Sequence, residues 1–157
     1  MKAASVSEIK DELSAQPAKE LVALCLRLSR FKKENKELLT YLLFEATDEA
    51  GFVQSVKAEM EILFLEINVS QLYFAKKSLR KIIRIINKYC RYSSVKTTEV
   101  ELRLYFCKLL IESGIPFKRN TVINNIYLSQ LKKLVTLIAA LHEDLQYEYL
   151  RELETYE

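Results

Sequence analysis

Glycine and proline are almost missing from this sequence, with two residues of each type in the whole chain. Gly51 and Gly114 lie far apart, so no loop can combine them. Loops that cradle phosphate groups need closely spaced glycines, because backbone N–H groups must approach the ligand. The sequence therefore excludes glycine-rich nucleotide-binding loops. All-β and α/β folds also use many glycine and proline turns, so the scarcity favours an all-helical protein.

Histidine occurs once, at His142. The residues that follow it begin like the zinc motif H-E-x-x-H, but Gln146 stands where the second histidine ligand is required. Helical di-iron sites need Glu-x-x-His pairs on two helices, which one histidine cannot supply. We therefore expect a non-enzyme with no catalytic residue, metal or cofactor. The less favoured alternative is an enzyme with a Cys–His pair at His142 or with a carboxylate site. The acidic face formed by Asp144, Glu148 and Glu152 could hold a cation, but a solvated helix face is the favoured interpretation.

The cysteines are few and widely spaced, and each lies among apolar residues of an expected helix: Cys25, Cys90 and Cys107. This pattern is typical of buried, reduced thiols rather than of a metal or redox site. The first residues contain no apolar segment of signal-peptide length, and no stretch is long and uncharged enough to span a membrane. We therefore expect a cytoplasmic protein without a membrane span.

Apolar residues recur at helical spacing along the whole chain and predict six to seven helices. Successive helices joined by short turns favour antiparallel neighbours. The predicted fold class is all-α, with helices stacked as hairpins in an irregular helical bundle or a short α-solenoid. The length is that of one domain, so residues 1–157 are expected to form a single all-helical domain.

Several helix ends can be placed from the sequence. Ser5 and Glu8 form a capping box, Asp48 is a good N-cap, and Gly114 before Ile115 and Pro116 ends a helix sharply. Residues 17–47 form either one helix or two, and Asn35 within a polar run favours two. Residues 121–157 read as one long C-terminal helix, either kinked near residue 142 or projecting. Its distal half is a candidate for contact with another copy or with a partner protein.

The segment over residues 70–92 has the most distinctive pattern. On a helical wheel its cations fall within an arc of about 140°, and apolar residues fill the opposite side. Such a wide apolar side predicts a helix packed between several others. The cations are the candidate residues for binding a polyanion or a partner: Lys76, Lys77, Arg80, Lys81, Arg84, Lys88 and Arg91.

Charge is sorted into blocks along the chain. Residues 67–142 carry 14 basic and 3 acidic side chains, whereas residues 143–157 carry 1 basic and 6 acidic ones. Two explanations follow from this sorting. The cations either pair with the chain's own acidic residues or face solvent, or they bind an external polyanion such as nucleic acid, an acidic protein segment or an anionic membrane surface. The acidic residues available for internal pairing are Glu143, Asp144, Glu148, Glu152 and Glu154.

The favoured function is that of a non-enzymatic interaction or scaffold protein. It would contact a protein partner or a second copy through the basic helix and the C-terminal helix. The alternative is a protein that binds nucleic acid or another polyanion through the basic face. Only Tyr73 lies among the cations as an aromatic platform for bases, which weakens this alternative. No small-molecule cofactor is implied by either function.

Overall fold

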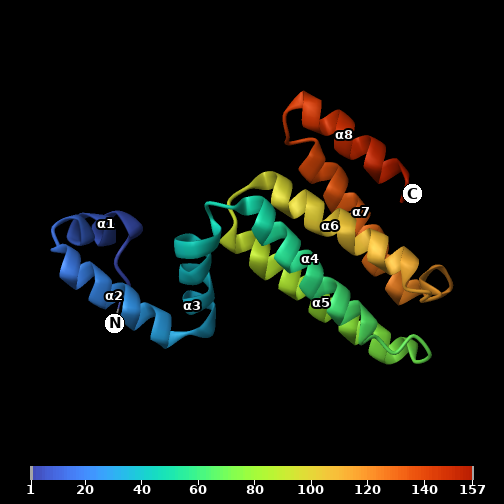
Figure 1. Ribbon diagram of the computed structural model, residues 1–157, viewed down its shortest axis with the longest axis horizontal. Coiled ribbons are helices and arrows are strands. Elements are labelled where there is room, and N and C mark those ends of the chain that lie inside the picture. The colour runs from blue at the N-terminus through green and yellow to red at the C-terminus, as the bar shows by residue number, and fades with distance from the viewer. Residues whose placement is uncertain (1, 157) are drawn as a thin grey trace. The chain divides into compact units, whose positions relative to one another are not determined.

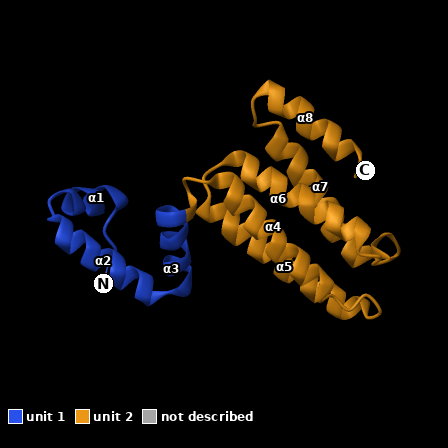
Figure 2. Cartoon of the chain, in the orientation of Figure 1, with its two compact units in different colours: residues 1–44 blue, residues 45–157 orange. Residues whose placement is uncertain are grey.

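The computed structural model describes residues 2–156, and Figure 1 shows their path. The chain is 80% helical, and no strand occurs among the described residues. The predicted all-α fold is confirmed. The chain divides into two compact units, residues 1–44 (unit 1) and residues 45–157 (unit 2), which Figure 2 colours separately. The single domain predicted over 1–157 stays a prediction, because compactness alone does not decide whether two units fold together.

Unit 1 is built from short helices: α1 (Val6–Ser14), α2 (Ala18–Phe31) and α3 (Lys33–Thr40), followed by the π-helical turn η1 (Tyr41–Glu45). The predicted capping box is present, because Ser5 Oγ accepts from the Glu8 amide at 3.3 Å and the Ser5 amide donates to Glu8 Oε2 at 2.7 Å. Residues 17–47 are not one helix, since Lys32 is extended between α2 and α3. Asn35 stabilises this corner by donating from Nδ2 to the Leu28 carbonyl at 2.9 Å.

None of the residues of α1, α2 and α3 is buried. Apolar side chains nevertheless repeat along α1 and α2, and in α2 they extend to Leu28 and Phe31, which are 59% and 76% exposed. Cys25 is exposed as well. The prediction that all three cysteines are buried is therefore wrong for Cys25, because the helix that carries it has no covering layer within unit 1. Cys107 is buried as predicted, and Cys90 is half-buried.

Unit 2 contains the remaining helices: α4 (Glu49–Leu65), α5 (Leu72–Tyr92), α6 (Lys96–Glu112), the short 3₁₀ turn η2 (Phe117–Arg119), α7 (Thr121–Ile138) and α8 (Glu143–Glu154). Asp48 caps α4 as predicted, accepting from the Gly51 amide at 3.0 Å. Gly114, at φ 72°, takes the left-handed conformation that ends α6. Counted over residues 2–156, eight α-helices are present rather than six to seven.

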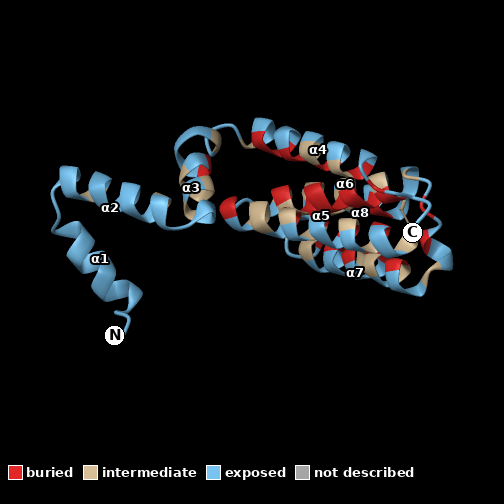
Figure 3. Ribbon diagram, turned by 90° about the horizontal axis from the view of Figure 1, so that it is seen from below, coloured by how far each residue is buried: buried red, intermediate tan, exposed pale blue. Residues whose placement is uncertain are grey.

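The core of unit 2 lies around α6, which packs against α4, α5 and α7. Figure 3 shows the buried residues gathered where these helices face one another. Phe106 of α6 is completely buried and meets the Phe64 ring of α4 at a centroid distance of 5.6 Å. Because α6 has neighbours on several sides, it is apolar over most of its circumference. This arrangement leaves one side of α5 packed and the other side free for solvent.

The segment 121–157 folds as two helices, and the break falls close to residue 142, where a kink was one of the two expected alternatives. The chain leaves α7 after Ile138, and His142 takes an extended conformation before α8. Gln146 Nε2 donates to the carbonyl of Leu141 at 2.8 Å and so satisfies a backbone acceptor at the break. α8 then packs back against α7, with the Tyr127 hydroxyl donating to the Tyr156 carbonyl. The distal half therefore does not project, and partner binding by this segment stays a prediction.

Candidate interaction surface on helix α5

The basic face of α5 consists of seven cations on the side of the helix that points away from the core. Five of them are exposed and two are half-buried. The exposed ones are Lys77, Arg80, Lys81, Arg84 and Arg91, and the half-buried ones are Lys76 and Lys88. The structure therefore brings all seven predicted residues onto one helix, on the side opposite its buried residues. Whether this face binds anything stays a prediction.

Burial of the opposite side holds this orientation. Leu79, Ile82 and Ile86 are at most 1% exposed and pack toward the core of unit 2. Burying a side chain of this size stabilises the fold by about 1.5–3 kcal/mol, so rotation of α5 about its axis would be costly. The cations consequently remain on the outside for as long as unit 2 is folded.

Most cations of the basic face have no carboxylate partner among the described residues. Over residues 2–156, no ion pair is formed by Lys76, Lys77, Arg80, Lys81, Arg84 or Arg91. The acidic residues of α8 were the predicted internal partners, but α8 packs on α7, and its only ion pair in the described residues joins Asp144 to His142 at 3.4 Å. A shallow hollow on the basic face is lined by Lys77, Arg80, Ile83 and Arg84.

Two aromatic side chains lie at the start of α5, beside the first cations. Tyr73 and Phe74 are 58% and 51% exposed, and their ring centroids are 5.4 Å apart. The ammonium groups of Lys77 and Lys76 lie 4.5 and 5.1 Å from the Tyr73 ring centroid. A hydrogen bond from Lys77, together with its charge, lowers the pKa of Tyr73. The wheel placed Phe74 on the apolar side, so its exposure in the first turn is a feature that periodicity alone did not reveal.

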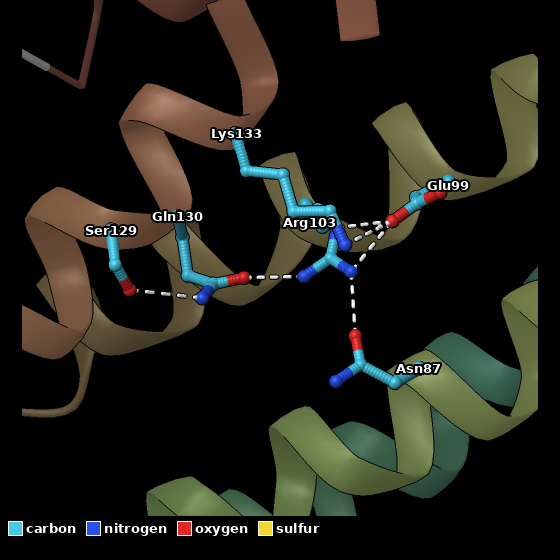
Figure 4. A network of polar contacts seen from close by, with 6 residues as sticks. All are labelled: Asn87, Glu99, Arg103, Ser129, Gln130 and Lys133. Atoms are coloured by element: carbon cyan, nitrogen blue, oxygen red, sulfur yellow. Dashed lines mark hydrogen bonds and ion pairs between the residues drawn. The ribbon is translucent and has the colours of Figure 1, made fainter. Parts of the chain in front are cut away.

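One cation of the basic segment 67–142 is buried and bonded to neighbouring helices, and Figure 4 shows its contacts. Arg103 of α6 is 1% exposed and donates to Glu99 Oε1 at 2.6 and 2.9 Å, to Gln130 Oε1 at 2.5 Å and to Asn87 Oδ1 at 2.6 Å. These partners come from α5, α6 and α7, so Arg103 ties three helices together. The only sequence signal was the four-residue spacing of Glu99 and Arg103, because the other two partners are distant along the chain.

Glu99 is the carboxylate on which this network converges. Lys133 Nζ lies 2.9 Å from the same oxygen that Arg103 contacts. Burial acts to raise the pKa of Glu99, but hydrogen bonds from Lys133 and Arg103 and their positive charges outweigh it and hold the pKa below its ordinary value. The network therefore keeps Glu99 charged and fixes how α6 meets its neighbours, and we assign it a structural role.

The enzymatic alternative depends on a thiol with His142, or on carboxylates of the C-terminal segment. Burial raises the pKa of the Cys90 and Cys107 thiols to about 12, which opposes formation of the nucleophilic thiolate. His142 is exposed at the start of α8, beside Asp144. Among residues 2–156, no three histidine, cysteine or acidic side chains are grouped so that they could hold a metal ion.

Comparisons with protein-family models, with curated protein sequences and with solved structures found no match for this chain. In the described part of the chain, no helix has both the length and the apolar composition needed to cross a membrane.

Proposed function

We propose that the chain is a non-enzymatic interaction protein that binds an acidic segment of a protein partner along the basic face of α5. The observation that carries the proposal is the set of six cations on this face for which the described residues supply no paired carboxylate. The cytoplasmic location expected from the sequence, and the lack of a cofactor, stay predictions that go with this function.

The spacing of the cations gives an energetic reason for binding an acidic partner. Lys76, Arg80, Arg84 and Lys88 follow one another at intervals of four residues, which places them side by side along the helix. Like charges at this spacing destabilise a helix by about 0.2–0.5 kcal/mol per pair. An acidic partner removes this repulsion on binding. The buried side of α5 meanwhile keeps the backbone ordered, so the helix itself has little to reorganise.

Nucleic-acid binding is the second candidate function, and the aromatic pair at the start of α5 favours it. Exposed rings beside cations are the usual platform on which single-stranded bases stack, at about 1–3 kcal/mol per base. Tyr73 and Phe74 supply two such rings, whereas the sequence suggested only Tyr73. A poly-glutamate peptide has no ring to stack on Tyr73 and Phe74, so these residues separate the two functions experimentally.

The test is a binding titration with two labelled probes, a poly-glutamate peptide and a single-stranded oligonucleotide. We expect the peptide to bind the wild-type chain and to bind more weakly as salt rises. The double variant Arg80→Glu/Arg84→Glu should lose binding while its circular dichroism spectrum is unchanged. The control is Lys118→Glu/Arg119→Glu, which changes the net charge equally at two exposed residues outside α5 and should retain binding.

The outcomes separate the candidates. If the wild type binds neither probe at low salt, or if both double variants lose binding equally, the proposed function is wrong. A preference for the oligonucleotide would favour the second candidate, with affinity falling on the order of 10²–10³-fold between about 50 and 200 mM salt. In that case Tyr73→Ser/Phe74→Ser should weaken oligonucleotide binding and leave peptide binding as it is.

A further inference from the structure

The hollow on the basic face of α5 has one apolar residue in its lining. Three of the four lining side chains are cations, and Ile83 is the fourth. Ile83 is half-buried, so part of its side chain meets solvent where it lines the hollow. The helical wheel assigns Ile83 to the apolar side, about 20° beyond the edge of the arc that holds the cations. The structure therefore adds an apolar contact point to the basic face.

The cations of the hollow lie around Ile83 and leave part of it accessible. The ammonium group of Lys77 lies 4.5 Å from the Tyr73 ring centroid, and Arg84 Nε donates to the Arg80 carbonyl at 3.4 Å. Both contacts are made to residues one turn earlier, so they direct the two side chains toward the start of α5. None of the three cations forms an ion pair within the described chain. A ligand can therefore reach the cations and Ile83 together.

We infer that the acidic segment bound by α5 carries an apolar side chain, such as leucine, which packs on Ile83 while carboxylates beside it pair with the surrounding cations. A segment of carboxylates alone would leave the accessible part of Ile83 in water, or would place a charge against it at a cost in desolvation. An apolar side chain removes this surface from water instead. The inference rests on the proposed function, because it names a further feature of the partner of the same surface.

The test compares two labelled peptides of equal length and charge, Glu-Glu-Glu-Leu-Glu-Glu-Glu and Glu-Glu-Glu-Ser-Glu-Glu-Glu. Each is titrated into the full chain at the same low salt concentration. Because the two peptides carry the same carboxylates, a difference in affinity reports the central side chain alone. We expect the leucine peptide to bind about five-fold more tightly, which corresponds to the burial of about 40 Å² of apolar surface.

The variant Ile83→Ser should lower the affinity for the leucine peptide to that for the serine peptide, and should leave the affinity for the serine peptide unchanged. The matched control is Ile85→Ser, which makes the same change at another half-buried residue of α5. Ile85 is not part of the lining of the hollow, and two residues of helix place it on the other side of α5. This control should keep the preference for leucine. Circular dichroism checks that both variants remain helical.

An NMR measurement on the unchanged chain does not depend on how the variants fold. With the δ1 methyl groups of isoleucine labelled, we expect intermolecular NOEs from the leucine methyl groups of the peptide to Ile83 and none to Ile85. Equal affinities of the two peptides for the wild type would overturn the inference and leave the proposed function standing. A preference that survives Ile83→Ser, or NOEs to other isoleucines only, would do the same. If neither peptide binds, the inference and the proposed function are both wrong.

Discussion

Units 1 and 2 keep their apolar side chains in different places. In unit 2, α6 packs against three helices, and eight of its residues are buried. In unit 1, α2 repeats apolar residues just as regularly and buries none of them. The difference teaches that periodic spacing specifies a helix and its apolar side, but not the element that covers this side. Helices whose cover comes from the same unit make a core, whereas α1, α2 and α3 keep their apolar side chains exposed.

The largest expected difference between the units is in the loss of stability when one aromatic ring is removed from each. Phe106→Ala deletes a completely buried side chain of α6 and should destabilise unit 2 by about 3–5 kcal/mol. Phe31→Ala makes the same chemical change on α2, where the side chain is 76% exposed, and should change stability by less than about 0.5 kcal/mol. Urea unfolding of dilute protein measures both. Similar losses in the two variants would mean that α2 contributes to a core as α6 does.

A smaller effect is expected from pH, through the buried network of unit 2. The pKa of Glu99 is lower in the folded chain than its ordinary value of 4.5, so the folded state favours the charged carboxylate. The resulting stability is complete above pH 4.5 and is lost as pH falls through the lower folded pKa. Thermal unfolding between about pH 6 and pH 3 should therefore show a steeper acid loss in the wild type than in Glu99→Gln.

The control for this pH experiment is Glu101→Gln, which removes a carboxylate two residues away that pairs with Lys57 at 3.1 Å, outside the buried network. Its loss of thermal stability in acid should be as steep as that of the wild type. An acid loss that is equally steep in Glu99→Gln would show that Glu99 is not held charged by Arg103 and Lys133.

Much of the fold could be predicted because its signals are local. The capping box at Ser5 and Glu8, the cap at Asp48 and the left-handed end at Gly114 each depend on residues within one turn. The basic face of α5 could be predicted equally well, because both its cations and its apolar residues follow the helical period. The all-α class follows from the same spacing together with the scarcity of glycine and proline.

The remaining features depend on contacts between distant residues. The break between α7 and α8 contains neither glycine nor proline, and Gln146 stabilises it only after the chain has turned back. Arg103 finds Gln130 and Asn87 on other helices, which no spacing rule reveals. Cys25 lies on a helix with a normal apolar pattern and is exposed because nothing in unit 1 covers it. These misses share one cause, since each depends on which helices become neighbours.

The contrast between the units is tested most directly by amide hydrogen exchange on the dilute, monomeric chain. Amides of α6 should exchange only through opening of the whole of unit 2, because their helix is surrounded by α4, α5 and α7. Amides of α1, α2 and α3 should exchange orders of magnitude faster, because these helices bury no residue. Protection of α2 equal to that of α6 in the monomer would contradict the account.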